Sequence, residues 1–157
     1  MVKHTVRILE IIDEGIDTKT FYLEKPVDFN WEEGSHTHIA LDGYDSNEVP
    51  NKSLVRHMSI MTLAQENRIG FTTRFPSQKS EYKTLLSTYQ VGDKLSLFKL
   101  GSRMSLRREN RPIVLLSMGV GIATMRPLIL SYIQNKQSIR GLTHINVDPH
   151  PTIYRND

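Results

Sequence analysis

The segment Arg56-His57-Met58-Ser59 carries two groups with complementary chemistry, three positions apart, in a stretch that reads as a strand. A guanidinium offers a planar fork of N–H donors that suits a pyrophosphate, and a serine hydroxyl can bond a ring nitrogen of an aromatic cofactor. Arg56 and Ser59 could therefore serve the two ends of one cofactor. Taken alone, the same four residues would also suit an ordinary strand with an exposed arginine and serine.

Two later segments have the composition of turns that bind anions or nucleotides. Ser80 precedes a short helical pattern, and helix N-termini attract anions through free N–H groups and the helix dipole. Gly119 and Gly121 directly follow a continuous apolar run. Such a turn lets the backbone approach a nucleotide at the mouth of a strand.

Short strands dominate the first two thirds of the chain. Residues 2–12, 18–23, 37–41, 55–61, 68–75 and 94–98 are rich in β-branched, aromatic and alternating apolar residues, with turn residues between most of them. Six such strands predict a closed antiparallel barrel. Residues 80–89 have apolar side chains at helical spacing, which predicts one helix capping the barrel.

The pattern changes after Pro112. Residues 113–116 read as a buried strand, 122–135 as a helix that tolerates Pro127 in its first turns, and 142–147 as a second buried strand. Two parallel strands bury little surface on their own. We therefore expect this α/β unit to be a fragment, or to be completed by a partner chain or a second copy.

The composition excludes several classes of protein. A formal charge of +3 over 157 residues is too small and dispersed for a nucleic-acid-binding protein. With no cysteine, disulfides, thiolate zinc sites and cysteine-ligated clusters are excluded, so redox chemistry would need an organic cofactor. Without a signal peptide or an apolar run long enough to cross a bilayer, we expect a cytoplasmic protein that does not bind membranes.

In this order, the segments resemble those of the ferredoxin–NADP reductase superfamily along nearly the whole chain. Residues 56–59 resemble its flavin signature Arg-x-Tyr-Ser, and residues 34–39 resemble the Gly-Gln-apolar-Val stretch before it. Ser80 and the later Gly92-Asp93 resemble the helix that receives the pyrophosphate and the turn that follows. Residues 101–106 resemble the end of a Gly-Pro-x-Gly segment, and residues 117–125 resemble the turn Gly-Gly-Thr-Gly-Ile-Thr-Pro-Met.

The resemblance implies a mainly β protein: a six-stranded antiparallel Greek-key FAD-binding barrel with one capping helix over residues 1–110, and a truncated NAD(P)-binding α/β unit over residues 111–157. It implies FAD as cofactor, NAD(P)H as substrate, an acceptor such as ferredoxin or flavodoxin, and no catalytic acid or base. The cofactor-binding residues that it implies are Arg56, His57, Met58, Ser59, Thr72, Arg74, Lys79, Ser80, Gly119, Gly121 and Ile122.

The chain departs from the family pattern at functional positions. Met58 replaces the tyrosine that packs on the cofactor, and Ala123 replaces the threonine of the nucleotide turn. Two alternatives therefore stay open. One is a FAD-binding electron-transfer module without its own NAD(P)H site, and the other is a structural relative that has lost the cofactor.

Three other groups of residues have two interpretations each. His36 and His38 share a strand face, but no third ligand is evident, so we predict no metal site. The arginines at 103, 107, 108 and 111 form either a solvated hairpin or a docking face for a small acidic electron-transfer protein. Asp148 follows the last strand like a ribose-binding acid, although it lies 148 − 121 = 27 positions after Gly121.

Overall fold

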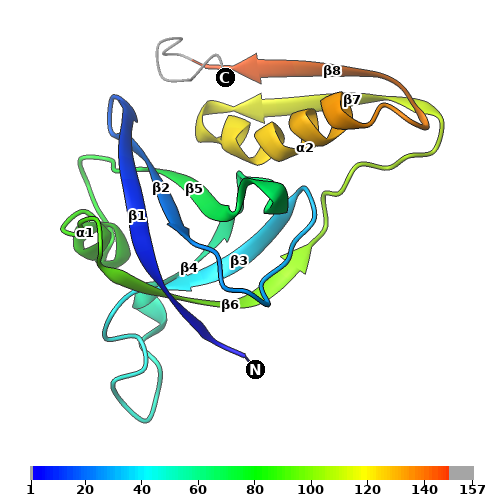
Figure 1. Ribbon diagram of the computed structural model, residues 1–157. Helices are drawn as coiled ribbons and strands as arrows, with labels where there is room; N and C mark the ends of the chain where they lie inside the picture. Colours follow the sequence, from blue (N-terminus) through cyan, green and yellow to red (C-terminus); the bar gives the residue numbers. More distant parts are fainter. Residues whose placement is uncertain (1, 149–157) are drawn as a thin grey trace.

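The computed structural model describes residues 2–148, which form a curved six-stranded antiparallel sheet and a two-stranded parallel sheet (Figure 1). The larger sheet has the spatial order β4-β3-β6-β1-β2-β5. Its strands are β1 (His4–Gly15), β2 (Thr18–Glu24), β3 (Ser35–Ala40), β4 (Val55–Ser59), β5 (Arg68–Arg74) and β6 (Lys94–Ser102). The predicted mainly β fold class is confirmed.

The two outer strands of the larger sheet, β4 and β5, meet just beyond the end of β4. The amide of Met61 donates to the carbonyl of Gly70 at 2.8 Å, and the amide of Gly70 donates to the hydroxyl of Thr62 at 3.0 Å. The sheet therefore curls until its edges touch at one end. Among residues 2–148, β4 pairs along its own length with β3 only, so its other edge is unpaired.

Apolar side chains fill the inside of this curled sheet. Phe21 and Phe71 stack with ring centroids 5.0 Å apart, and both are buried. The single tryptophan, Trp31, donates its indole N–H to the carbonyl of Thr62 at 2.7 Å, which satisfies the polar end of a buried ring. The core thus reaches the segment that follows β4.

The capping helix α1 (Glu81–Leu86) is shorter than the predicted 80–89. Tyr82 and Leu86 are buried against the barrel, as their spacing predicts. After Leu86, the hydroxyls of Ser87 and Thr88 bond the carbonyls of Thr84 and Leu85. These side-chain bonds end the helix by satisfying carbonyls in its last turn.

The smaller sheet joins β7 (Arg111–Met118) to β8 (Ile139–Val147), with α2 (Ile122–Gln134) between them in the sequence. Helix α2 covers one face, where Leu115 and Leu128 are buried. On the opposite face Val114, Leu116 and Met118 are 65%, 66% and 72% exposed. The prediction of two buried strands is therefore wrong for this face of the sheet, where β7 and β8 carry exposed apolar side chains. The domain boundary at residue 110 stays a prediction. Residues 149–157 of the predicted second domain lie outside the described residues.

Strands β1, β6, β7 and β8 run longer than predicted, and β1 shows why. The β1–β2 hairpin extends to the pair Gly15–Thr18, so the polar residues Asp13 and Glu14 lie in a strand rather than in a turn. Pairing with β2 overrides their low strand propensity.

Within residues 2–148 no helix is both long and apolar enough to span a membrane.

Gly34 is the position where the fold most clearly needs a glycine. Its φ is +76°, and a Cβ there would lie 2.6 Å from the carbonyl carbon of Met104. The close approach lets the loop before β3 pass directly under the segment that follows β6. Both strain and overlap would oppose any other residue.

We expect Gly34→Ala to lower the free energy of unfolding by about 2 kcal/mol or more, because left-handed strain and a backbone clash add together. Gly141→Ala is the matched control, because a Cβ there meets nothing within 4 Å. Urea unfolding followed by Trp31 fluorescence measures both. Equal stability of the two variants would contradict this account of Gly34.

Candidate functional site

Strand β4 carries four of the predicted cofactor residues, and alternation divides them between two faces. Successive strand side chains point to opposite sides, so Arg56 and Met58 share one face, and His57 and Ser59 share the other. A ligand that contacts both Arg56 and Ser59 must therefore pass along the edge of β4. That edge is the side of β4 not paired with β3.

Arg56 lies against the capping helix. Its Nη1 donates to the carbonyl oxygens of Val55 at 2.6 Å and Ser53 at 3.1 Å, and its guanidinium sits 5.3 Å from the centre of the Tyr82 ring. The structure thus brings Arg56 to the helix that Ser80 begins. Within residues 2–148 no carboxylate pairs with the Arg56 guanidinium.

A cavity of about 420 Å³ opens at the Ser59 end of β4. Ser59 lies opposite His36 in the β3–β4 register, and the rings of His36 and His57 are stacked 6.0 Å apart. The cavity is lined by Gly34, His36, His57, Met58, Ser59, Arg103 and Met104. Hydroxyl, imidazole and thioether groups around an open space suit a polar aromatic ring.

His38 stands beside this cavity without lining it. Its ring centroid is 3.7 Å from that of His57, on the paired strand. Burial, followed by the charges of His57 and Lys99, lowers the pKa of His38 below its usual value. His38 is therefore neutral near neutral pH and packs as an aromatic ring.

The other predicted residues of the barrel are Thr72, Arg74 and Lys79. Thr72 is half-buried, and its hydroxyl bonds that of Thr20 at 2.7 Å. Arg74 and Lys79 are exposed, and Lys79 lines a separate cavity of about 500 Å³ beside Asp13 and Asp17. Their place in a cofactor site stays a prediction.

Ser80 is the N-cap of α1, as predicted, and its hydroxyl accepts from the amide of Lys83 at 3.4 Å. Helix α1 has only six residues, so its dipole is small. Sequence reasoning missed Lys83, whose amine turns toward β5 and bonds the hydroxyl of Thr73. A lysine among helix residues gives no signal of this; only the packing of α1 on the barrel does.

The predicted glycine turn forms between β7 and α2. Gly119 has φ +51°, Gly121 caps α2, and Ile122 is the first helical residue. Just before the turn, the buried hydroxyl of Ser117 bonds His144 Nε2 at 2.8 Å and Asn146 Oδ1 at 2.7 Å on β8. The turn is therefore anchored to the second strand.

Arg126 of α2 ties this unit to the barrel, and sequence reasoning missed it. Its two terminal nitrogens donate to the Glu66 carboxylate at 2.8 and 3.0 Å, and Nη1 also donates to the Met61 carbonyl. Burial alone would raise the pKa of Glu66, but hydrogen bonds from Arg126 and from the Leu63 amide lower it below its usual value. This clamp holds the glycine turn near the end of β4.

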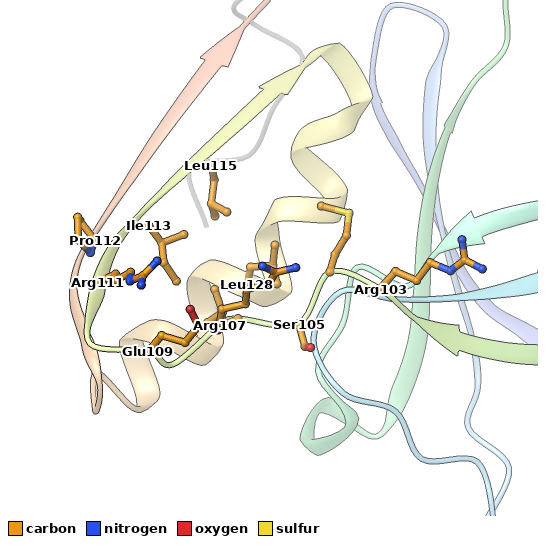
Figure 2. Close-up of a pocket in the computed structure, with 11 residues that line it drawn as sticks. Arg103, Ser105, Arg107, Glu109, Arg111, Pro112, Ile113, Leu115 and Leu128 are labelled. Carbon is orange, nitrogen blue, oxygen red and sulfur yellow. The ribbon is translucent and has the colours of Figure 1, made fainter.

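The basic run before β7 divides into two roles. Arg108 is structural, because its Nη1 donates to the carbonyls of Asn135 at 2.7 Å and Gln137 at 3.0 Å near the end of α2. Arg103, Arg107 and Arg111 line a cavity of about 390 Å³ over the buried side chains of α2 and β7 (Figure 2). Within residues 2–148, their side chains form no hydrogen bond or ion pair.

Among solved structures, the chain is similar to a ferredoxin NADP+ reductase from Neisseria gonorrhoeae with bound FAD and NADP, at a TM-score of 0.80 and 17% identity over 96% of this chain and 59% of that one. A Plasmodium falciparum ferredoxin-NADP+ reductase gives 0.77 and 12%, over 98% of this chain and 62% of the other. The chain has the fold of ferredoxin–NADP reductases. The resemblance seen in the motifs is confirmed at the level of the fold.

Phthalate dioxygenase reductase, described as transferring electrons from pyridine nucleotides to a [2Fe-2S] centre, matches with a TM-score of 0.76 and 16% identity over 96% of this chain and 45% of its own. The chain thus spans about half the length of these reductase structures. No family model and no curated protein matches the sequence. With identities this low, the comparisons establish the reductase fold, and the ligands of this chain must be argued from its own residues.

We expect Glu66→Gln to lower the free energy of unfolding by about 1 kcal/mol near neutral pH, because it removes a bidentate, charge-assisted pair that solvent partly screens. The folded-state pKa of Glu66 is below the unfolded value, so its stabilisation is present above the unfolded pKa and is lost as pH falls through the folded one.

Urea unfolding at neutral pH and near pH 3 measures this difference, with the exposed Glu48→Gln as control. The Glu66→Gln deficit should shrink in acid, whereas Glu48→Gln should match the wild type throughout. A deficit that persists unchanged in acid would show that the carboxylate charge is not what stabilises the contact.

Proposed function

We propose that this chain is the flavin-binding part of a FAD-dependent oxidoreductase that passes electrons from NAD(P)H through FAD to an acceptor. The observation that carries the proposal is the unpaired edge of β4, with an uncompensated Arg56 on one face and the Ser59 cavity on the other. It occurs in a fold shared with a reductase solved with FAD and NADP bound.

The residues present fit FAD at both ends of β4. Arg56 would bind the diphosphate, because its guanidinium has no carboxylate partner among the described residues. Ser59 would donate its hydroxyl to the flavin ring, with His57 and Met58 beside the ring and the ribityl chain. The flavin, when bound, supplies the redox chemistry, and the protein orients it and excludes water. No side chain has to act as a general acid or base for hydride transfer.

The nicotinamide nucleotide would approach from the Gly119–Ile122 turn. Gly119 takes a left-handed conformation, and the Arg126–Glu66 clamp holds the turn against the barrel. We also include four residues around the cofactor, on the resemblance alone: Thr72, Arg74, Lys79 and Ser80. Of these, Ser80 is on the same helix as the Tyr82 ring that Arg56 covers.

The acceptor that we propose is a small acidic electron-transfer protein such as ferredoxin or flavodoxin. Arg103, Arg107 and Arg111 are exposed and unpaired among residues 2–148, which favours attraction of an acidic surface. Arg103 lines both the 390 Å³ cavity and the cavity beside Ser59. A partner bound to these arginines would therefore lie close to the proposed flavin ring.

A second candidate function is a FAD-binding electron-transfer module that has no NAD(P)H reaction of its own. The exposed aliphatic face of β7 and β8 favours it, because a partner chain that covered this face could also supply the nucleotide site. The two candidates differ in whether NADH or NADPH can reduce the bound flavin.

We expect the purified chain to bind added FAD and to show the visible absorption of a protein-bound flavin. Anaerobic NADH or NADPH should then bleach the band if the chain is a reductase. A band that persists, yet bleaches with a chemical reductant, supports the electron-transfer module. Failure to retain FAD after gel filtration would contradict both candidates.

We expect Arg56→Ala to weaken FAD binding by about 2 kcal/mol, because a charge-assisted contact with the diphosphate is lost, and to leave riboflavin binding nearly unchanged. Flavin fluorescence titration measures both affinities. Arg7→Ala, at an exposed arginine of β1, is the control and should alter neither. Equal losses for FAD and riboflavin would rule out a diphosphate contact.

A further inference from the structure

Two cations interact where α1 packs against the barrel, because the charge of Arg56 acts on the amine of Lys83. Arg56 of β4 rests on the ring of Tyr82, and Lys83, the next residue of the helix, directs its amine to Thr73 of β5. The partners of both cations are neutral: backbone carbonyls for Arg56 and a hydroxyl for Lys83. Within residues 2–148 neither forms a salt bridge.

The elements packed around Lys83 bring no negative charge to its amine. From β5 comes the Thr73 hydroxyl, and just after β5 comes the Phe75 ring, whose centre is 5.3 Å from Nζ. From β4 comes Arg56, a like charge. On α1 itself, Tyr82 is buried and neutral, and the exposed Glu81 carboxylate accepts a bond from Ser53 at 2.6 Å. An isolated pair of cations is costly unless an anion joins it.

The local environment disfavours the charged amine. Burial, followed by the Arg56 charge, lowers the pKa of Lys83 from 10.5 to about 8. For the fold alone, the gain is limited to the bond with Thr73 and the contact with the Phe75 ring, neither of which neutralises the charge. A lysine that receives an anion would recover its charge in the complex.

We propose that Lys83 is the second cation of a diphosphate subsite, that it works as a pair with Arg56, and that it binds the FAD diphosphate in its protonated form. The inference rests on the proposed function and adds a residue that the flavin signature does not contain. Arg56 provides a fixed fork, and Lys83 provides a point charge on a flexible chain that can leave Thr73 for the phosphate.

Such a pair makes cofactor affinity depend on pH in one direction. The bound diphosphate favours the protonated amine, so the pKa of Lys83 is higher in the complex than in the free protein. Affinity is then constant below about pH 8 and falls as pH rises through the free-protein value. Arg56 contributes no such dependence, because arginine stays protonated throughout this range.

The test is a flavin fluorescence titration with FAD at about pH 7 and about pH 9.5, with riboflavin as the reference ligand. Riboflavin has the same ring and no diphosphate, so ring titration cancels in the comparison. We expect FAD affinity, relative to riboflavin, to fall about tenfold between the two pH values, which corresponds to one unit of pKa difference between the free and bound forms.

Three variants separate the explanations. Lys83→Arg should keep FAD affinity at both pH values, because its charge does not titrate. Lys83→Met should bind FAD about tenfold more weakly at pH 7, with no further loss at high pH. Lys94→Met, at an exposed lysine of β6, should behave as the wild type. Circular dichroism checks that each variant is folded.

Wild-type FAD binding that does not change with pH, or a loss that persists in Lys83→Arg, would overturn the role of Lys83 and leave the flavin proposal standing. So would a folded Lys83→Met variant with wild-type affinity. If the wild-type chain binds neither FAD nor riboflavin at either pH, both the subsite and the proposed function are wrong.

Discussion

The unpaired edge of β4 is the constraint on which the rest of the site depends. Strand alternation puts Arg56 and Ser59 on opposite faces, so one ligand can contact both only by lying along that edge. A further strand paired at that edge would block the path of such a ligand. The curled sheet meets this requirement by joining its outer strands through Met61 and Gly70, beyond the end of β4, and leaving β4 itself unpaired.

The cations of the structure differ in whether a carboxylate neutralises them. The Arg126–Glu66 pair is neutralised and connects two parts of the structure, whereas Arg56 and Lys83 remain a positive pair at the capping helix. Arg126 has a carboxylate partner within the fold, whereas Arg56 and Lys83 have only neutral partners among residues 2–148. A cation without a carboxylate partner remains available to an anionic ligand, which is the basis of the proposed diphosphate subsite.

Several features of the site could be predicted from the sequence because they are local. The strand that contains Arg56 and Ser59, the cap at Ser80 and the glycine turn at Gly119 follow from propensity and turn chemistry. The length of β1 could not be predicted, because pairing with β2 holds Asp13 and Glu14 in a strand. The end of α1 depends on the hydroxyls of Ser87 and Thr88, which compete for its last carbonyls.

The sequence by itself determined the order of elements, the barrel fold class and the candidate cofactor residues of β4, because short-range periodicity and motif spacing encode them. Only the tertiary structure decided that Lys83 lies near Arg56 and that Arg126 pairs with Glu66. These relations join residues far apart in the sequence or depend on how α1 packs. Spacing along the chain carries no information about which side chain a fold will bring to another.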